Sequence, residues 1–252
     1  MSHAPMSDQE HQKRYVEAIG RARLEGANSF QSWFDRSKDV RQAMIDGYWD
    51  LASQILTPMV CRYLLDPEEK VALEIGYGGG RILQAACSYF KEVIGIDIHN
   101  EQDTVEAFLR QQGKSNFRLI KTSGRTIDVD SASIDFIYSF IVLQHLCSFD
   151  AFVSYVKETY RCLKPGGLAQ LYFGRYSAQH AFYRLRYFLQ GYREIPTAPV
   201  NHVSLVVRVA KARRLCRDIG LQVIDVGTSI KRVSSERRRI KGGQSYVTLF
   251  KE

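Results

Sequence analysis

The stretch ALEIGYGGGRIL, residues 72–83, places four glycines within five positions, between an apolar run and a segment with helical spacing. A carboxylate, Glu74, lies two residues before the first glycine. Glycines between a strand and a helix leave the backbone bare, so a ligand can approach the peptide N–H groups closely. The stretch therefore predicts a ligand site at a strand-to-helix turn, and the ligand must tolerate a neighbouring negative charge.

Short apolar runs alternate with helical segments from this stretch onward. Strands are expected at 71–75, 93–98, 117–121, 134–141 and 168–173, and helices at 79–90, 101–112, 149–163 and 205–219. Two further runs follow at 221–227 and 244–252, and the last alternates as an antiparallel edge strand does. Runs that are apolar on both faces indicate a parallel sheet with helices on both sides. The sequence thus predicts an α/β fold with a doubly wound, mostly parallel, seven-stranded sheet.

Two regions fall outside this alternation. Residues 1–65 are expected to form an N-terminal helical lid, because apolar residues recur there at helical spacing. Residues 66–252 are expected to form the main domain, which an insertion rich in aromatic residues and arginine interrupts at about 174–203. In a doubly wound sheet, the turn after the first strand lies where nucleotide-like ligands bind.

The net charge of +8 is unevenly distributed along the chain. Residues 1–150 hold 16 Lys and Arg against 21 Asp and Glu, whereas residues 151–252 hold 19 against 6. Basic residues concentrate at 208–220 and 231–243, where they would attract nucleic acid, a nucleotide-linked substrate or a membrane surface. A solvated helix face and a basic loop explain the same pattern, because no aromatic residues are interleaved as single-strand stacking requires. Both interpretations stay open.

The chain has no apolar run of about 18 residues that could span a bilayer. Its polar first stretch lacks the apolar centre of a secretory signal, so a cytoplasmic protein is expected. The five cysteines form no CxxC pair and are expected to be reduced and buried. No His, Cys, Asp and Glu cluster has metal-ligand spacing, so no metal is expected. The oligomeric state is left open.

The glycine spacing distinguishes two nucleotide-like ligands. The dinucleotide pattern G-x-G-x-x-G is met by Gly76 and Gly78, but Arg81 stands at the third glycine position. No G-K-[ST] follows, so the stretch is not a P-loop. Glu74 would repel a pyrophosphate, whereas S-adenosylmethionine carries a sulfonium and an ammonium group that a carboxylate attracts.

The stretch at residues 72–83 resembles the first motif of the class I S-adenosylmethionine-dependent methyltransferases. Their first motif is an acidic residue followed by G-x-G-x-G, present here as Glu74, Gly76, Gly78 and Gly80. Asp97 ends the second expected strand, where the family has an acidic residue that accepts both ribose hydroxyls. Residues 133–146 resemble the fourth motif, and residues 161–173 resemble the Pro-Gly turn and fifth strand of the family.

The resemblance covers residues 71–173 well and 205–252 moderately. It implies a Rossmann-like methyltransferase fold with S-adenosyl-L-methionine as cofactor. The implied cofactor contacts are Glu74, Gly76, Tyr77, Gly78, Gly80, Asp97, Ile98, Gly124, Arg125 and Ser139. The family often has an acidic residue after the third strand, which is missing here, so backbone and apolar contacts around Gly124 and Arg125 are expected to hold the adenine.

Methyl transfer to a hydroxyl requires a base. His145, just beyond the fourth-motif strand, is expected at the mouth of the pocket, and a histidine ordinarily titrates near neutrality. A packing or capping role explains His145 equally well. Substrate contacts are expected from the N-terminal helices and the insertion, at Tyr48, Arg175, Tyr176 and His180, with His202 as a further candidate base.

The preferred prediction is O-methylation of a small or medium acceptor, namely a sugar, a glycan or another natural product. If the basic C-terminal half helps to bind this acceptor, the acceptor is expected to be anionic. The alternative is a methyltransferase-fold protein that binds or methylates RNA or another polyanion through that half. Charge reversal at Arg237, Arg238 and Arg239 would then abolish binding. The Asn/Asp-Pro-Pro-Tyr/Phe motif of many nitrogen-directed methylases is missing after Tyr138, which disfavours flipped-base and amide chemistry.

Overall fold

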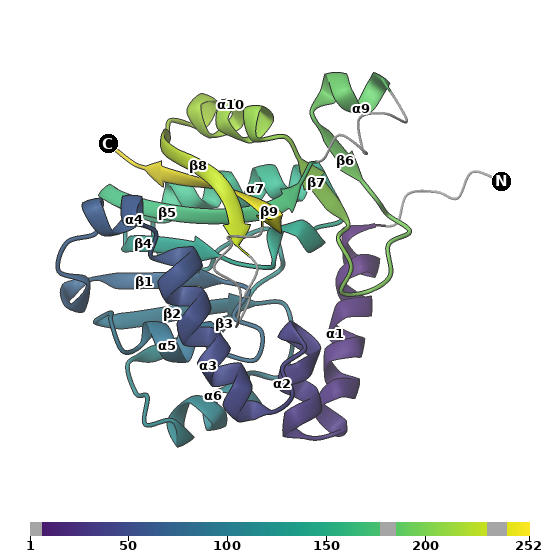
Figure 1. Ribbon diagram of the computed structural model, residues 1–252, viewed down its shortest axis with the longest axis vertical. Coiled ribbons are helices and arrows are strands. Elements are labelled where there is room, and N and C mark those ends of the chain that lie inside the picture. The colour runs from purple at the N-terminus through teal and green to yellow at the C-terminus, as the bar shows by residue number, and fades with distance from the viewer. Residues whose placement is uncertain (1–6, 177–184, 231–240) are drawn as a thin grey trace.

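A twisted sheet runs through the centre of the molecule, with helices on both of its faces (Figure 1). The computed structural model describes residues 7–176, 185–230 and 241–252. Within these residues the strands are β1 (Val71–Ile75), β2 (Glu92–Asp97), β3 (Phe117–Lys121), β4 (Ile134–Ser139), β5 (Leu163–Arg175), β6 (Tyr192–Glu194), β7 (Leu205–Val207), β8 (Gln222–Ile230) and β9 (Lys241–Phe250).

The doubly wound arrangement predicted from the sequence is confirmed. Five parallel strands lie in the order β3-β2-β1-β4-β5. β9 pairs with β5 in the antiparallel direction and β8 pairs with β9, which gives the seven strands expected. The strand count is nevertheless higher in the described part of the chain, which has a nine-stranded sheet.

The two additional strands come from the end of the insertion and the residues after it. β7 pairs in parallel with the last residues of β5, with Val206 opposite Gly174, and β6 pairs antiparallel to β7. The helix expected at 205–219 consequently begins later, as α10 (Val209–Ile219). Leu205–Val207 form a strand because these apolar residues, two of them β-branched, are fully buried beside β5.

The other helices are α1 (Asp8–Leu24), α2 (Ala27–Asp35), α3 (Val40–Asp50), α4 (Pro58–Tyr63), α5 (Arg81–Ala86), α6 (Gln102–Gln111), α7 (Phe149–Cys162) and α9 (Leu185–Gln190), with a π-helical turn at Leu51–Ile55 and 3-10 turns at Pro67–Glu69 and Leu143–His145. Alternate residues of β1 face opposite cores. Leu73 belongs to the core that includes residues of α7 and α10, whereas Ala72 belongs to the core that includes residues of α5, α6 and the π-helical turn. The sheet is therefore buried on both faces, as its apolar runs indicated.

The N-terminal helices begin at residues suited to capping. The hydroxyl of Ser7 accepts a hydrogen bond from the backbone N–H of Glu10 and starts α1, and Asp39 starts α3 in the same way. α3 packs so tightly on α5 that a Cβ added at Gly47 would lie 1.9 Å from the carbonyl oxygen of Arg81. Only glycine allows this approach of the two helices.

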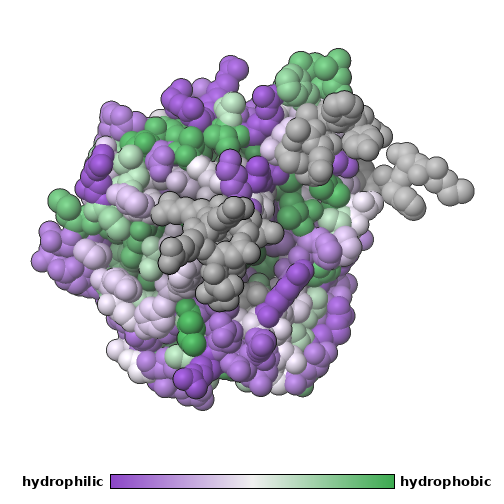
Figure 2. All heavy atoms as spheres, in the orientation of Figure 1, coloured by the Kyte–Doolittle hydropathy of each residue, from purple (hydrophilic) through white to green (hydrophobic). Residues whose placement is uncertain are grey.

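The surface in Figure 2 is mostly hydrophilic, with hydrophobic side chains gathered over α9. Leu185 and Leu189 on this short helix are 74% and 75% exposed. Among the described helices, none combines the length and apolar character needed to cross a membrane.

Candidate active site

A pocket opens at the ends of β1, β2 and β4, beside the glycine loop. Asp97 at the end of β2, Ile98 just after it and Gly124 after β3 line it. The segments 140–142 and 145–147 after β4 add a further wall, and side chains of α1 and α2 complete it. The structure therefore brings together Glu74, Gly76, Tyr77, Gly78, Asp97, Ile98, Gly124 and His145 from the residues predicted by sequence.

The glycine loop is shaped by close contacts that a side chain would prevent. Gly78 has a φ of +52°, and a Cβ there would lie 2.8 Å from the ring of Phe34. A Cβ at Gly76 would lie 2.3 Å from the side chain of Val142. Gly80 has a different place, because it starts α5 and its α-carbon faces Val105 of α6 rather than the pocket.

Asp97 is held by the backbone at the edge of this loop. One carboxylate oxygen accepts the N–H of Gly78 at 2.8 Å, and the other accepts the N–H of Ile98 at 2.7 Å. His99, which the sequence analysis missed, is fully buried and donates its Nε2–H to the carbonyl of Gly78 at 3.0 Å. Its Nδ1 accepts the N–H of Glu101, so the neutral ring is fixed in one tautomer. His99 and Asp97 together fix the position of Gly78.

Glu74 is only 3% exposed and faces the pocket from β1. Burial raises the pKa of its carboxyl to about 8, although the hydrogen bond from the Tyr138 hydroxyl and the nearby Arg81 lower it. Arg81 itself forms a buried ion pair with Asp50 of α3, with 2.6 Å between Nη1 and Oδ2. The residue that breaks the dinucleotide pattern thus ties α5 to the N-terminal helices, and its charge is balanced.

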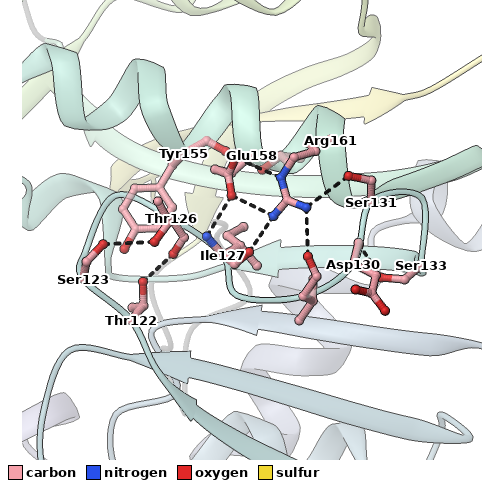
Figure 3. A network of polar contacts seen from close by, with 12 residues as sticks. Thr122, Ser123, Thr126, Ile127, Asp130, Ser131, Ser133, Tyr155, Glu158 and Arg161 are labelled. Carbon is pink, nitrogen blue, oxygen red and sulfur yellow. Dashed lines mark hydrogen bonds and ion pairs between the residues drawn. The ribbon is translucent and has the colours of Figure 1, made fainter.

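The loop between β3 and β4, which contains Gly124, is anchored to α7 (Figure 3). Arg161 donates to the carbonyls of Ile127 and Val129, and Glu158 accepts the N–H of Ile127 at 2.9 Å. Hydrogen bonds from Arg161 lower the pKa of Glu158, so this carboxylate stays charged. The network holds the loop in place, although the Arg125 side chain turns to Asp8 of α1.

α1 contributes more to the pocket than the sequence indicated. The carboxylate of Asp8 accepts hydrogen bonds from Arg125, Cys147 and Ser148. His11 donates from Nε2 to the carbonyl of His145 at 2.7 Å, and the Tyr15 hydroxyl accepts the N–H of Asn201. These contacts join α1 to the loops after β3 and β4 and to the insertion. The spacing of His11, Tyr15 and Ile19 on one helix face was the only available signal.

His145 lies at the pocket, but its expected titration near neutrality is wrong. Burial lowers its pKa to about 4, despite the hydrogen bond from its Nδ1–H to the carbonyl of His202 at 2.8 Å. Its Nε2 faces the amide nitrogen of Gln144 at 3.1 Å, which can only donate. Both ring nitrogens of the neutral His145 are therefore engaged.

Several predicted residues lie elsewhere in the described part of the chain. The hydroxyl of Tyr48 meets Ser88 at the exposed surface of α3, and Arg175 donates to the carbonyl of Gly242. Tyr176 and the buried Ser139 are likewise not in the pocket wall. His180 and the basic run with Arg237, Arg238 and Arg239 lie outside the described residues.

The comparisons with known proteins agree with this geometry. Residues 73–171 match the family model of a methyltransferase domain. The fold is similar to that of S-adenosylmethionine-dependent methyltransferases from Methanosarcina mazei, with 21% identity, 78% of this chain and 98% of that chain covered and a TM-score of 0.59. It is also similar to that of an S-adenosylmethionine-dependent methyltransferase from Clostridium acetobutylicum, with 15% identity, 81% of this chain and 92% of that chain covered and a TM-score of 0.60.

A Pyrococcus horikoshii protein, 17% identical with a TM-score of 0.59, covers 88% of this chain and 96% of its own. No curated protein matches the sequence. The matched segment includes the glycine loop and Asp97, which line the pocket. Residues 73–171 thus match a methyltransferase domain, the chain has the fold of the S-adenosylmethionine-dependent methyltransferases, and it is an enzyme that uses S-adenosylmethionine.

Proposed function

We propose that the enzyme transfers the methyl group of S-adenosylmethionine to a hydroxyl oxygen of a small acceptor, in the class of sugars, glycans and other natural products. The observation that carries this proposal is the cover over the pocket. α2 contacts the glycine loop, where the amide of Gln31 donates a hydrogen bond to the carbonyl of Gly79. α1 forms hydrogen bonds with the loops after β3 and β4. A small molecule suits such a covered pocket, whereas a polynucleotide needs an open groove.

The residues in the pocket suit the methyl donor. Each oxygen of Asp97 accepts one N–H and keeps a second acceptor position, which fits a ribose diol. Glu74 offers a carboxyl group to an ammonium. Tyr77 lines the pocket, and its buried hydroxyl has no hydrogen-bond partner among the described residues, which leaves it able to bind a polar ligand atom if the site opens to it.

The bound donor supplies an electrophilic methyl carbon on a sulfonium. Positioning of the acceptor and exclusion of water provide much of the rate enhancement in such an in-line displacement. The apolar wall includes Tyr15, Trp33 and Phe140, which exclude water from the reacting atoms. The charge that develops is small, because the acceptor proton leaves as the sulfonium loses its charge.

The test uses donor labelled in its methyl group and two pools of acceptors. One pool contains phenols, monosaccharides and glycosides, and the other is total RNA. We expect label only in the small-molecule pool, and none with Asp97→Ala. Label in RNA that falls steeply with salt would overturn the proposal and support the polyanion alternative.

A further inference from the structure

We propose that His11 is the general base of the reaction and that the acceptor hydroxyl is phenolic. This inference rests on the proposed O-methyl transfer and names the substrate class for that pocket. No sequence motif pointed to His11, which lies in the first turn of α1.

The ring of His11 has one engaged and one free nitrogen. The side chain lines the pocket, and the residue is only 7% exposed. Because a backbone carbonyl can only accept, the bond to the His145 carbonyl places the proton of the neutral ring on Nε2. Nδ1 then carries a lone pair and is buried without a partner among the described residues. A buried acceptor without a donor is costly, and the hydroxyl of an acceptor molecule would satisfy it.

His145 is less suited to this role. Its Nδ1–H donates to the carbonyl of His202, and its Nε2 accepts from the amide of Gln144. One of these hydrogen bonds must break before the ring can take a proton from the acceptor. Its backbone carbonyl instead fixes the ring of His11. His145 is thus a positioning residue for His11.

The charges around His11 favour a neutral ring that can become protonated during the reaction. Burial lowers the pKa of His11, the hydrogen bond to the His145 carbonyl raises it, Arg14 lowers it, and Asp8 one turn earlier raises it. The ring is therefore neutral at pH 7 and available as a base. The carboxylate of Asp8, which also binds Arg125, stabilises the imidazolium that forms.

The pocket wall favours a flat, uncharged acceptor. Aromatic rings of Tyr15, Trp33, Phe34 and Phe140 line it. Within the described residues, two nearby cations are balanced, since Arg81 pairs with Asp50 and Arg125 with Asp8. Neither of these two arginines is therefore free to pair with a phosphate or carboxylate. A base with a lowered pKa also suits a phenol, whose pKa is about 10 as in tyrosine, better than the much less acidic hydroxyl of a sugar.

The reaction balances without a further reactant. A lone pair of the phenolic oxygen forms the O–C bond to the methyl group, and the C–S bond breaks with its electron pair moving to sulfur. The phenolic proton passes to Nδ1 of His11. The resulting imidazolium returns the proton to water as the product leaves.

The test compares phenols of different acidity with His11→Gln, whose amide can keep the hydrogen bond to the His145 carbonyl but provides no base. We expect the natural chain to methylate phenols. His11→Gln should bind S-adenosylhomocysteine normally, with little change in KM for the phenol, and lose about 100-fold in kcat on 2-naphthol. The loss should shrink on 4-nitrophenol, which ionises without help. Lys13→Gln, on the exposed side of the same helix, is the control and should keep full activity.

Three results would overturn the inference. They are no methylation of any phenol by a chain that binds S-adenosylhomocysteine, unchanged kcat in His11→Gln, and an equal loss on all phenols, which would indicate a structural role. Failure of the natural chain to bind S-adenosylhomocysteine would instead contradict the proposed function as a whole.

Discussion

The carboxyl group of Glu74 is protonated at neutral pH, because burial raises its pKa to about 8. The native state therefore keeps a proton that the unfolded chain releases from about pH 4.5 upward, and this group's contribution to stability falls as the pH rises towards 8. A ligand with an ammonium beside Glu74 favours the ionised form. Binding should then expel the proton.

We predict release of about one proton when S-adenosylhomocysteine binds at pH 7, and an affinity that increases from pH 6 to pH 8. Calorimetry in phosphate and in Tris measures this release, since the two buffers differ in ionisation enthalpy. Glu74→Gln should bind without it. The same release in Glu74→Gln would show that another group titrates.

A substitution at Gly78 tests whether ligand binding depends on the backbone conformation of the glycine loop. Gly78→Ala combines a positive φ with a contact of 2.8 Å to Phe34, so it should reduce the affinity for S-adenosylhomocysteine at least tenfold. Gly113→Ala is the matched control, because Gly113 also has a positive φ but no atom within 4 Å of an added Cβ. It should cost about 1 kcal/mol of stability and keep binding. Equal binding by both variants would contradict the assigned role of the loop.

At the scale of elements, hydrogen bonds of the first turn of α1 hold this helix against the loops that line the pocket. Asp8 accepts from Arg125, Cys147 and Ser148, which belong to two different loops. We predict that Asp8→Ala costs about 1 kcal/mol, since the ion pair with Arg125 is partly exposed and screened by water. Hydrogen exchange should rise across α1 and leave β1 protected.

The matched change is Glu17→Ala on the exposed side of α1, where the ion pair with Lys13 is long at 3.9 Å. It should leave the exchange of α1 almost unchanged. If both variants exchange alike, Asp8 does not fasten the helix.

The sequence predicted those parts of the site that lie within a motif. Glu74 lies in β1, the glycines follow it and Asp97 ends β2, so a linear pattern of strands and motif residues located them. The contribution of α1 depends on contacts with residues more than 100 positions away, such as that of His11 with His145. No local pattern encodes such a contact. The lowered pKa of His145 likewise follows from burial by other elements.

Across the whole molecule, the alternation of apolar runs and helices predicted the doubly wound sheet. The strands β6 and β7 were missed, because each has three residues and a segment this short shows no periodicity. They extend the sheet beyond the end of β4, and the backbone N–H of Ser204, just before β7, binds the carbonyl of Gln144 near His145. The residues that follow the insertion thus hold the segment that carries His145.

The central claim is that the glycine loop and Asp97 bind S-adenosylmethionine. Calorimetric titration with S-adenosylhomocysteine tests it most directly, with NAD as the control ligand. The matched variants are Asp97→Ala and Asp103→Ala, the latter exposed on α6. The account predicts binding that Asp97→Ala weakens at least 100-fold and Asp103→Ala preserves, with no binding of NAD. Undiminished binding by Asp97→Ala, or no binding by the natural chain, would contradict it.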